Sequence, residues 1–450
     1  MGNILYNISV EKNEKIKISL KETKERRKTQ SPKVYQLKLQ NLSDGDIELL
    51  DRLFLEAKWL YNYIISDIQN RLTPNACKLK KVEVKVKDSF EKREIVHLGS
   101  HLKQSIIERT KDNLEGLSKS KEKGSRVGKL HFKSEINSLI LKQYGNTYKI
   151  DFKANKVQIQ KVKKGLRVLG LHQIPENAEI SKGELIKKHS GYYLYVTVFL
   201  NEESIVVKTK KNEIKEKNIE HFNKPLGIDF GIKNQLTFSN SIKVKYEVKE
   251  SERLKKLQKQ LARKKGYRKG EEKSKNFFKT LNKIKREYGR LSNIKKDIEN
   301  RVFAFIKSYE KVYMQDDNIK GWHAGLFGRQ IQHTGIGRIK ARLKNNLETL
   351  VLIGRYEPTT QTCSECRHKQ KMSLSDRVFK CESCGLEIDR DLNSARDMVL
   401  FGEKTPLINL SLDWAEVTPV EREASMRILE SNPYIRVSYT SLIQEALSFN

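Results

Sequence analysis

The sequence YEPTTQTCSECRHKQKMSLSDRVFKCESCGLEIDRDLNSARDM, residues 356–398, contains two pairs of cysteines. Cys363 and Cys366 form one Cys-x-x-Cys pair, Cys381 and Cys384 form the other, and fourteen residues separate the pairs. This spacing is typical of a small β-ribbon that closes four thiolates around one zinc ion. Because four thiolates leave no open coordination position, we expect the zinc to be structural.

An acidic helix start follows the second cysteine pair. Five residues after Cys384 the run Asp389, Arg390, Asp391 opens a helical pattern that continues through Asn393. We expect Asp389 to cap this helix and Arg390 to be placed where it could touch a phosphate. The zinc ribbon therefore positions Asp391 in the first turn, where other carboxylates could meet it.

The composition points to a polyanionic partner. The chain has 450 residues, and its 89 Lys and Arg against 56 Asp and Glu leave a formal charge of +33. Such an excess opposes compaction unless a polyanion neutralises it, so nucleic acid is the expected partner. The length suggests two or three domains.

The sequence also indicates in which cellular compartment the protein is located. No window approaches the ~18 consecutive apolar residues of a membrane span, and the first twenty residues lack the apolar core of a signal peptide. Four of the five cysteines lie in the paired motif and only Cys77 is left over, which favours metal ligation in a reducing compartment. We therefore expect a cytoplasmic protein with no membrane partner; the oligomeric state is left open.

The spacing of apolar residues changes along the first half of the chain. Residues 1–33 form a basic tail, and residues 34–200 are expected to form a β-barrel interrupted by a helical insertion at about 43–125. Short alternating runs between 130 and 200 support the barrel. Aromatic side chains lie among its basic residues and could stack on bases. Residues 201–224 lose apolar periodicity and are predicted to be a linker.

A strand with one carboxylate opens the second half. In Leu226–Gly231 the apolar side chains alternate with Gly227, Asp229 and Gly231, so Asp229 is flanked by residues without side chains. This predicts room for a metal ion and a phosphate beside Asp229. From the strand alone, a buried aspartate that caps a turn is equally compatible.

Residues 249–310 are helical and very basic. Residues 251–300 contain eighteen Lys or Arg and six Asp or Glu. The break at 266–272 predicts a hairpin of two helices, and the charge favours a surface that lies along a phosphate backbone.

A later strand brings further acids. In Lys311–Asn318 the residues Tyr313, Gln315 and Asp317 share one strand face, whereas Asp316 lies on the other. Asp229, Asp317 and Asp391 thus come from three segments, each near an element end. Two Mg2+ ions about 4 Å apart, held by such carboxylates, can cleave a phosphodiester.

These motifs carry a family resemblance. In order along residues 225–400 they are GIDFG, QDDNIKGW, CSEC, CESC and DRDLNSARDM, with the basic helices inserted after the first. They resemble the split RuvC-like nuclease and zinc ribbon of the TnpB transposon proteins, to which the type V CRISPR effectors look related. The resemblance implies an RNase H-like fold, a guide RNA, a short motif read in target double-stranded DNA, and Mg2+-dependent cleavage.

The resemblance assigns residues one by one. Asp229 matches the first catalytic acid of the family and Asp391 the third, but the usual second acid, a Glu, is replaced by Gln315. Because Asp317 lies two residues further on the same strand face, roughly 7 Å along, we expect it to act as a relocated ligand. The alternative is a site that Gln315 has disabled.

The sequence thus predicts an α+β multidomain protein. It would have an N-terminal, wedge-like β-barrel with a helical insertion, and a C-terminal RNase H-like nuclease domain carrying the ribbon. The predicted C-terminal parts are a RuvC-like region at 225–355, the zinc ribbon at 356–388, a final RuvC-like helix at 389–401 and a peripheral tail at 402–450.

We expect an RNA-guided DNA endonuclease with two Mg2+ ions and one structural zinc. One alternative is a nuclease-deficient RNA-guided DNA-binding protein, because Gln315 occupies the usual Glu position. The other is a guide-independent nuclease or a structural RNA-binding protein.

Overall fold

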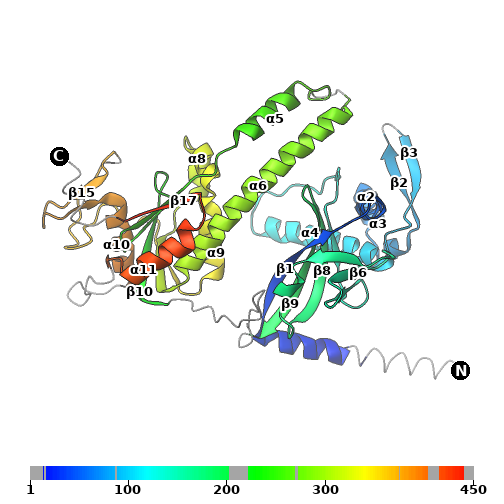
Figure 1. Cartoon of the computed structure of the whole chain (residues 1–450), viewed down its shortest axis with the longest axis horizontal. Helices are drawn as coiled ribbons and strands as arrows, with labels where there is room; N and C mark the ends of the chain where they lie inside the picture. The colour runs from blue at the N-terminus through cyan, green and yellow to red at the C-terminus, as the bar shows by residue number, and fades with distance from the viewer. Residues whose placement is uncertain are drawn as a thin grey trace. The chain divides into compact units, whose positions relative to one another are not determined.

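The structure, a computed structural model, describes residues 14, 17–86, 89–201, 221–268, 272–373, 375–403 and 415–439. The chain divides into two compact units, Met1–Lys217 and Asn218–Asn450 (Figure 1). Most of the predicted linker lies outside the described residues, and its two ends belong to strands β9 and β10. Of the helices in the described ranges, none has the length and apolarity that crossing a membrane requires.

A seven-stranded antiparallel sheet forms the centre of the first unit, with neighbours in the order β4-β8-β9-β1-β7-β6-β5. The strands are β1 (Gln30–Gln40), β4 (Ser138–Leu141), β5 (Tyr148–Asp151), β6 (Lys156–Ile159), β7 (Leu166–Leu169), β8 (Glu179–Lys188) and β9 (Gly191–Asn201). Tyr148 of β5 donates its hydroxyl to the carbonyl oxygen of Ser181 in β8, at 2.8 Å. Strand β5, at one edge of the sheet, therefore contacts β8, the neighbour of the other edge strand, and the nearly closed sheet agrees with the predicted barrel.

Helices and a hairpin are inserted between β1 and β4. They are α2 (Asp44–Ser66), α3 (Ile68–Arg71), the antiparallel pair β2 (Lys81–Val86) and β3 (Ser89–Glu94), and α4 (Ser100–Glu122). Ser43 caps α2, because its hydroxyl accepts from the backbone N–H of Asp46 while the Asp46 carboxylate accepts from the backbone N–H of Ser43. Within the predicted basic tail, residues 17–26 are helical.

The second unit contains a six-stranded mixed sheet in the order β14-β13-β10-β11-β12-β17. The strands are β10 (Phe222–Phe230), β11 (Leu236–Phe238), β12 (Ile242–Tyr246), β13 (Tyr309–Gln315), β14 (Leu350–Ile353) and β17 (Ile435–Tyr439). Strands β10, β13 and β14 are parallel, so their carboxyl ends meet at one edge. This edge is where Asp229 and Gln315 lie.

Helices cover both faces of this sheet, except for α5 (Glu252–Ala262), which packs against the outer part of α6 (Lys275–Ile306; Figure 1). The other helices are α7 (Ile319–Ala324), α8 (Gly328–Thr334), α9 (Ile336–Asn346), α10 (Arg390–Glu403) and α11 (Pro419–Ser425). On one face Ile228 and Met314 lie in a buried cluster with α6 and α9. On the other, Tyr313 is buried with Met398 of α10. The strand alternation thus directs Asp229 towards α10, whose Ser394 it contacts.

The C-terminal segment differs from the predicted tail. Residues 415–439 contain α11, a π-helical turn at Met426–Glu430, and β17, which pairs antiparallel with β12. Leu429 and Ile435 are buried in the main core of this unit. Glu421, fully buried, accepts hydrogen bonds from Tyr309 and Asn240 and pairs with Lys224 at 2.6 Å. The segment therefore completes the sheet. It escaped prediction because its strand is short and follows a stretch without apolar periodicity.

Candidate active site and metal centre

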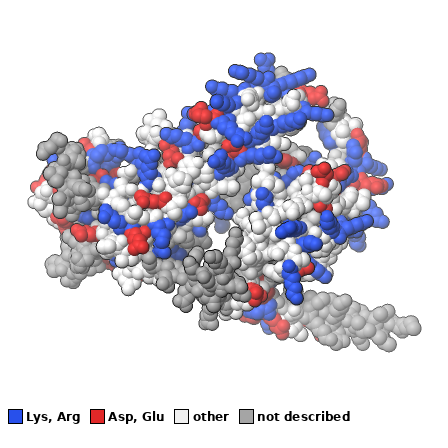
Figure 2. All heavy atoms as spheres, viewed as in Figure 1, with Lys and Arg blue, Asp and Glu red and all other residues white. Residues whose placement is uncertain are grey.

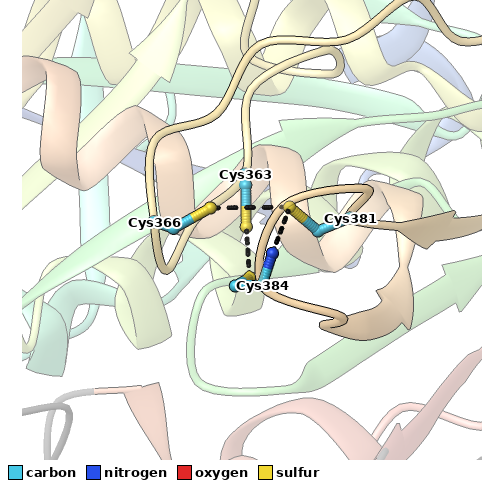
Figure 3. Close-up of side chains that lie close together, drawn as sticks. All are labelled: Cys363, Cys366, Cys381 and Cys384. Atoms are coloured by element: carbon cyan, nitrogen blue, oxygen red, sulfur yellow. Dashed lines mark hydrogen bonds between the residues drawn. The ribbon is translucent and has the colours of Figure 1, made fainter.

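The four cysteines converge in a compact group (Figure 3). Their sulfur atoms all lie within 4.8 Å of one another; the Cys363–Cys384 and Cys366–Cys381 separations are 3.6 and 3.5 Å. A tetrahedral zinc ion with Zn–S bonds of about 2.3 Å has sulfur atoms about 3.8 Å apart. The group is therefore of the right size and chemistry to hold one zinc ion.

Two tight turns present these sulfurs. The backbone N–H of Arg367 donates to the carbonyl of Cys363 and that of Gly385 to the carbonyl of Cys381, both at 3.0 Å. Gly385 has φ +76°, a conformation that glycine adopts without strain. The second turn joins β15 (Val378–Lys380) to β16 (Glu387–Asp389), so the predicted ribbon is a short antiparallel hairpin.

The ribbon is joined to α10 through buried polar contacts. Asn393 accepts from the backbone N–H of Ser364 at 3.0 Å and donates its side-chain amide to the carbonyl of Thr362 at 2.7 Å. Arg367 also forms an ion pair with Asp397 on the same helix. Metal binding by the cysteines would therefore fix the position of the helix that carries Asp391.

Asp389 caps α10, and this prediction is confirmed. Its Oδ1 accepts from the backbone N–H groups of Asp391 and Leu392, both at 3.1 Å, and its other oxygen pairs with Lys243 at 2.9 Å. Arg390 lies beside the carboxylate of Asp391, at 3.6 Å. The cap holds Asp391 in the first helical turn.

Asp229 lies among like charges at the end of β10. Burial raises the pKa of Asp229 well above its usual value, and the negative charges of Asp391 and Asp317 raise it further; the Arg390 guanidinium opposes them. Strand β10 pairs with β13, with Ile228 opposite Met314, and the Asp229 carboxylate contacts Ser394 of α10 at 3.5 Å, so the elements that carry or precede the three acids are neighbours. The spacing of the acids is wider than that of the cysteines, which are the one group within the described ranges whose ligand atoms all lie within 4.8 Å.

Asp317 has a buried cation as its neighbour. The Lys340 ammonium lies 3.8 Å from the Asp317 carboxylate and donates to the carbonyls of Gln315 and Asp317 at 2.7 and 3.0 Å. Burial raises the pKa of Asp317, and Lys340 opposes this shift. Asp316 pairs with Lys344 at 2.7 Å and also lies 3.9 Å from the Lys340 ammonium, so both carboxylates neighbour Lys340 and the prediction that Asp316 faces away was wrong.

Gln315 is engaged with backbone. Its Nε2 donates to the carbonyl oxygens of Gly354, Arg355 and Glu357 at 3.1, 3.1 and 2.8 Å. Its Oε1 accepts from the Thr359 hydroxyl at 3.4 Å. The side chain is therefore part of the loop that leads into the zinc ribbon.

The space predicted beside Asp229 is partly filled. A Cβ atom at Gly227 would lie 1.8 Å from the carbonyl oxygen of Ala395 in α10, and one at Gly231 would lie 2.5 Å from that of Asn234. The two glycines therefore permit close backbone packing. These contacts concern the places of the two missing side chains, and the room expected for a metal ion and a phosphate at the Asp229 carboxylate stays a prediction.

Three residues that contact the predicted site residues were not themselves predicted from the sequence. They are Lys340, which contacts Asp317, Thr359, which contacts Gln315, and Ser394, which contacts Asp229. A signal existed only for Lys340. It follows Ile336 and Ile339 on α9 and precedes Leu343, at the three- and four-residue spacing of a buried face. A lysine at such a position requires a buried partner, and two carbonyls and two carboxylates surround it.

Comparisons with known proteins point to the same region. Residues 336–398 match the family described as "Cas12f1-like, TNB domain". Over 46 residues the chain is 41% identical to the TnpB-like proteins L79 and L770 of Acanthamoeba polyphaga mimivirus. That match covers 10% of this chain and 9% of each relative, so the chain spans about a tenth of the relatives it matches.

A solved structure also aligns with the chain. It is a cryo-EM structure of a Cas12f1-sgRNA-target DNA complex, 16% identical, and the alignment covers 83% of this chain and all of that one. Its TM-score is 0.23, below the level at which a shared fold is implied.

Proposed function

The matches support membership of the TnpB family, and we propose that this chain is an RNA-guided DNA endonuclease. The first unit would bind guide RNA and target duplex DNA, as a wedge-like barrel with a helical recognition insertion. In the second unit, residues 225–355 and 389–401 would form an RNase H-like, RuvC-like nuclease, with the ribbon at 356–388 inserted in it.

One observation carries this proposal: β10 pairs with β13, and the Asp229 carboxylate at the end of β10 contacts Ser394 of α10, so the elements next to Asp229, Asp317 and Asp391 meet at one edge of the sheet. Three acids brought together from separate segments disfavour one another's ionised forms unless cations join them. Hard oxygen ligands of this kind suit Mg2+. We therefore assign Asp229, Asp317 and Asp391 to hold Mg2+, which when bound would activate the attacking water and stabilise the leaving oxygen.

The remaining residues supply positioning. Asp389 holds Asp391 at the start of α10, and Lys340 fixes the backbone that carries Asp317. Arg390 lies beside Asp391, where its guanidinium could bind a phosphate oxygen of the scissile strand. The cysteine group would hold a structural zinc that keeps the ribbon, and through Asn393 the helix α10, in place.

Cleavage of a guided target tests the proposal. The chain is purified with its co-expressed RNA, the RNA is sequenced, and DNA matching that RNA is incubated with the complex and Mg2+. We expect discrete RNA and a cut target, and no cut with Asp229→Asn or Asp391→Asn. An RNA-free preparation that cuts DNA without regard to sequence would contradict guidance.

A second function has one observation in its favour. Gln315, at the usual Glu position, is neutral and contacts backbone carbonyls. A nuclease-deficient RNA-guided DNA-binding protein would bind the same target tightly and leave it intact, and Asp317→Asn would then change nothing.

A further inference from the structure

An amide clamp lies beside the proposed catalytic carboxylates. The Gln315 Nε2, a donor of two N–H groups, faces three carbonyl oxygens of the segment 354–357. Carbonyl oxygens can only accept, so this end of the side chain must be the amide nitrogen. The clamp closes the loop that follows β14.

The closed loop leads to Asp229 through two buried hydroxyls. Thr359, 1% exposed, contacts the Gln315 Oε1 at 3.4 Å and the Ser394 hydroxyl at 3.0 Å. Ser394, fully buried in α10, donates to an Asp229 carboxylate oxygen at 3.5 Å. A chain of polar contacts thus joins Gln315 to Asp229, and because each hydroxyl carries one proton, two of the three contacts are hydrogen bonds at any one time.

A carboxylate would not serve at this position. Glu has the shape of Gln, but both of its ionised oxygens are acceptors, and one would face the three carbonyl oxygens. A contact between oxygen acceptors is unfavourable even at this exposed loop, so a carboxylate would turn away from the three carbonyls towards solvent. The environment of residue 315 is therefore built for an amide.

We propose that Gln315 is a positioning residue for Asp229 rather than a disabled metal ligand. By fixing residues 354–359 it seats Thr359 and Ser394, which hold the Asp229 carboxylate in the orientation that metal binding requires. The consequence for metal binding rests on the proposed function; the clamp itself does not.

Hydrogen exchange and metal affinity test the two parts. In Gln315→Ala and Gln315→Glu we expect faster amide exchange across residues 354–359 and a lower Tm. Thr359→Val removes only the hydroxyl group that contacts Gln315 and Ser394. It should weaken Mn2+ binding about tenfold, as losses of groups that orient metal ligands do. Thr359→Ser should retain the wild-type affinity. Thr334→Val is the matched control, because Thr334 is also buried and its hydroxyl bonds a backbone carbonyl in the same unit.

The outcomes separate the clamp from the nuclease assignment. If Gln315→Glu keeps the wild-type Tm and exchange and binds Mn2+ more tightly, residue 315 is a lost ligand and the proposal is overturned. If Thr359→Val and Thr334→Val weaken Mn2+ binding equally, Thr359 has no positioning role. If the wild type binds Mn2+ no better than Asp229→Asn, the proposed function fails, and unchanged exchange at 354–359 in Gln315→Ala would still overturn the clamp.

Discussion

Asp229 occupies surroundings that disfavour its ionised form. Burial and the charges of Asp391 and Asp317 both raise its pKa. In the unfolded chain this carboxyl group loses its proton near its ordinary pKa of about 3.8, whereas in the folded chain it keeps the proton up to the raised pKa. Between these two values, a rise in pH therefore lowers the free energy of unfolding. In the absence of a bound cation, this residue therefore lowers the stability of the fold at neutral pH.

Asp229→Asn should raise the Tm of the metal-free protein at pH 7.5 by a few degrees, because it removes a partly buried carboxylate and keeps the shape. The gain should shrink as pH falls towards 3.8, the ordinary value, and vanish well below it, where Asp229 is protonated in both states. Mg2+ should raise the Tm of the wild type and not of the variant. Calorimetry across pH provides the measurement.

Asp316→Asn is the matched control. The Lys344 ammonium lowers the pKa of Asp316, so its ionised form is favoured in the folded chain. Its removal should leave the Tm at pH 7.5 unchanged or slightly lower. An equal gain in both variants would indicate a general effect of net charge and would contradict the assignment to Asp229.

Lys340 provides a second test at the level of single residues. Lys340→Met should destabilise the fold by about 3–5 kcal/mol, since it leaves the buried Asp317 carboxylate and two carbonyls without their cation. Lys344→Met removes a half-exposed partner of Asp316 and should cost less than about 1 kcal/mol. Urea unfolding measures both. Equal costs would show that the burial of Lys340 has no energetic consequence.

At the scale of elements, the spacing of residues along the sequence was sufficient to predict several features of the site. The cysteine spacing predicted the ribbon, and Asp389 was correctly predicted as a cap. Strand alternation placed Asp229 opposite the apolar side chains of its own strand, as the structure does. These features depend on neighbours in the sequence. The role of β17 does not, because only pairing with β12 buries Ile435.

Close contacts between elements that are distant in the sequence could not be predicted either. Gly227 was interpreted as open space, yet the backbone of α10, more than 160 residues later in the chain, fills that space. The environment of Gln315 has the same origin, since the carbonyls it contacts belong to the loop after another strand. A residue type shows what a position permits, and only the tertiary structure shows what occupies it.

The packing of β10 on α10 yields a test of this contact. Gly227→Ala should destabilise the fold by about 1–3 kcal/mol or more, because the new methyl group would meet the carbonyl of Ala395, a rigid backbone atom. Gly45→Ala, in the first turn of α2, has no atom within 4 Å of the new methyl group and should be neutral or stabilising. Thermal unfolding compares the pair, and equal effects would exclude tight packing at Gly227.

At the scale of the whole chain, the charge of +33 has a concentrated component. Figure 2 shows Lys and Arg side chains gathered over α5 and α6. The two helices pack through Leu254, Leu257 and Ile284, which leaves their remaining surface to the basic residues. Two cationic helices held side by side repel each other, and a phosphate backbone along them would relieve that repulsion.

This surface should govern how RNA binding depends on salt. Each phosphate contact contributes about 0.7–0.9 to the slope of log affinity against log salt concentration. Replacing the exposed Lys256, Lys279 and Lys283 by alanine should therefore reduce the slope by about 2–3 and weaken binding most at low salt. A control triple removes exposed lysines that already pair with a carboxylate: Lys28, Lys81 and Lys380. If both triples change the slope equally, net charge alone attracts RNA; a larger change from the hairpin triple would mean that a strand lies along α5 and α6.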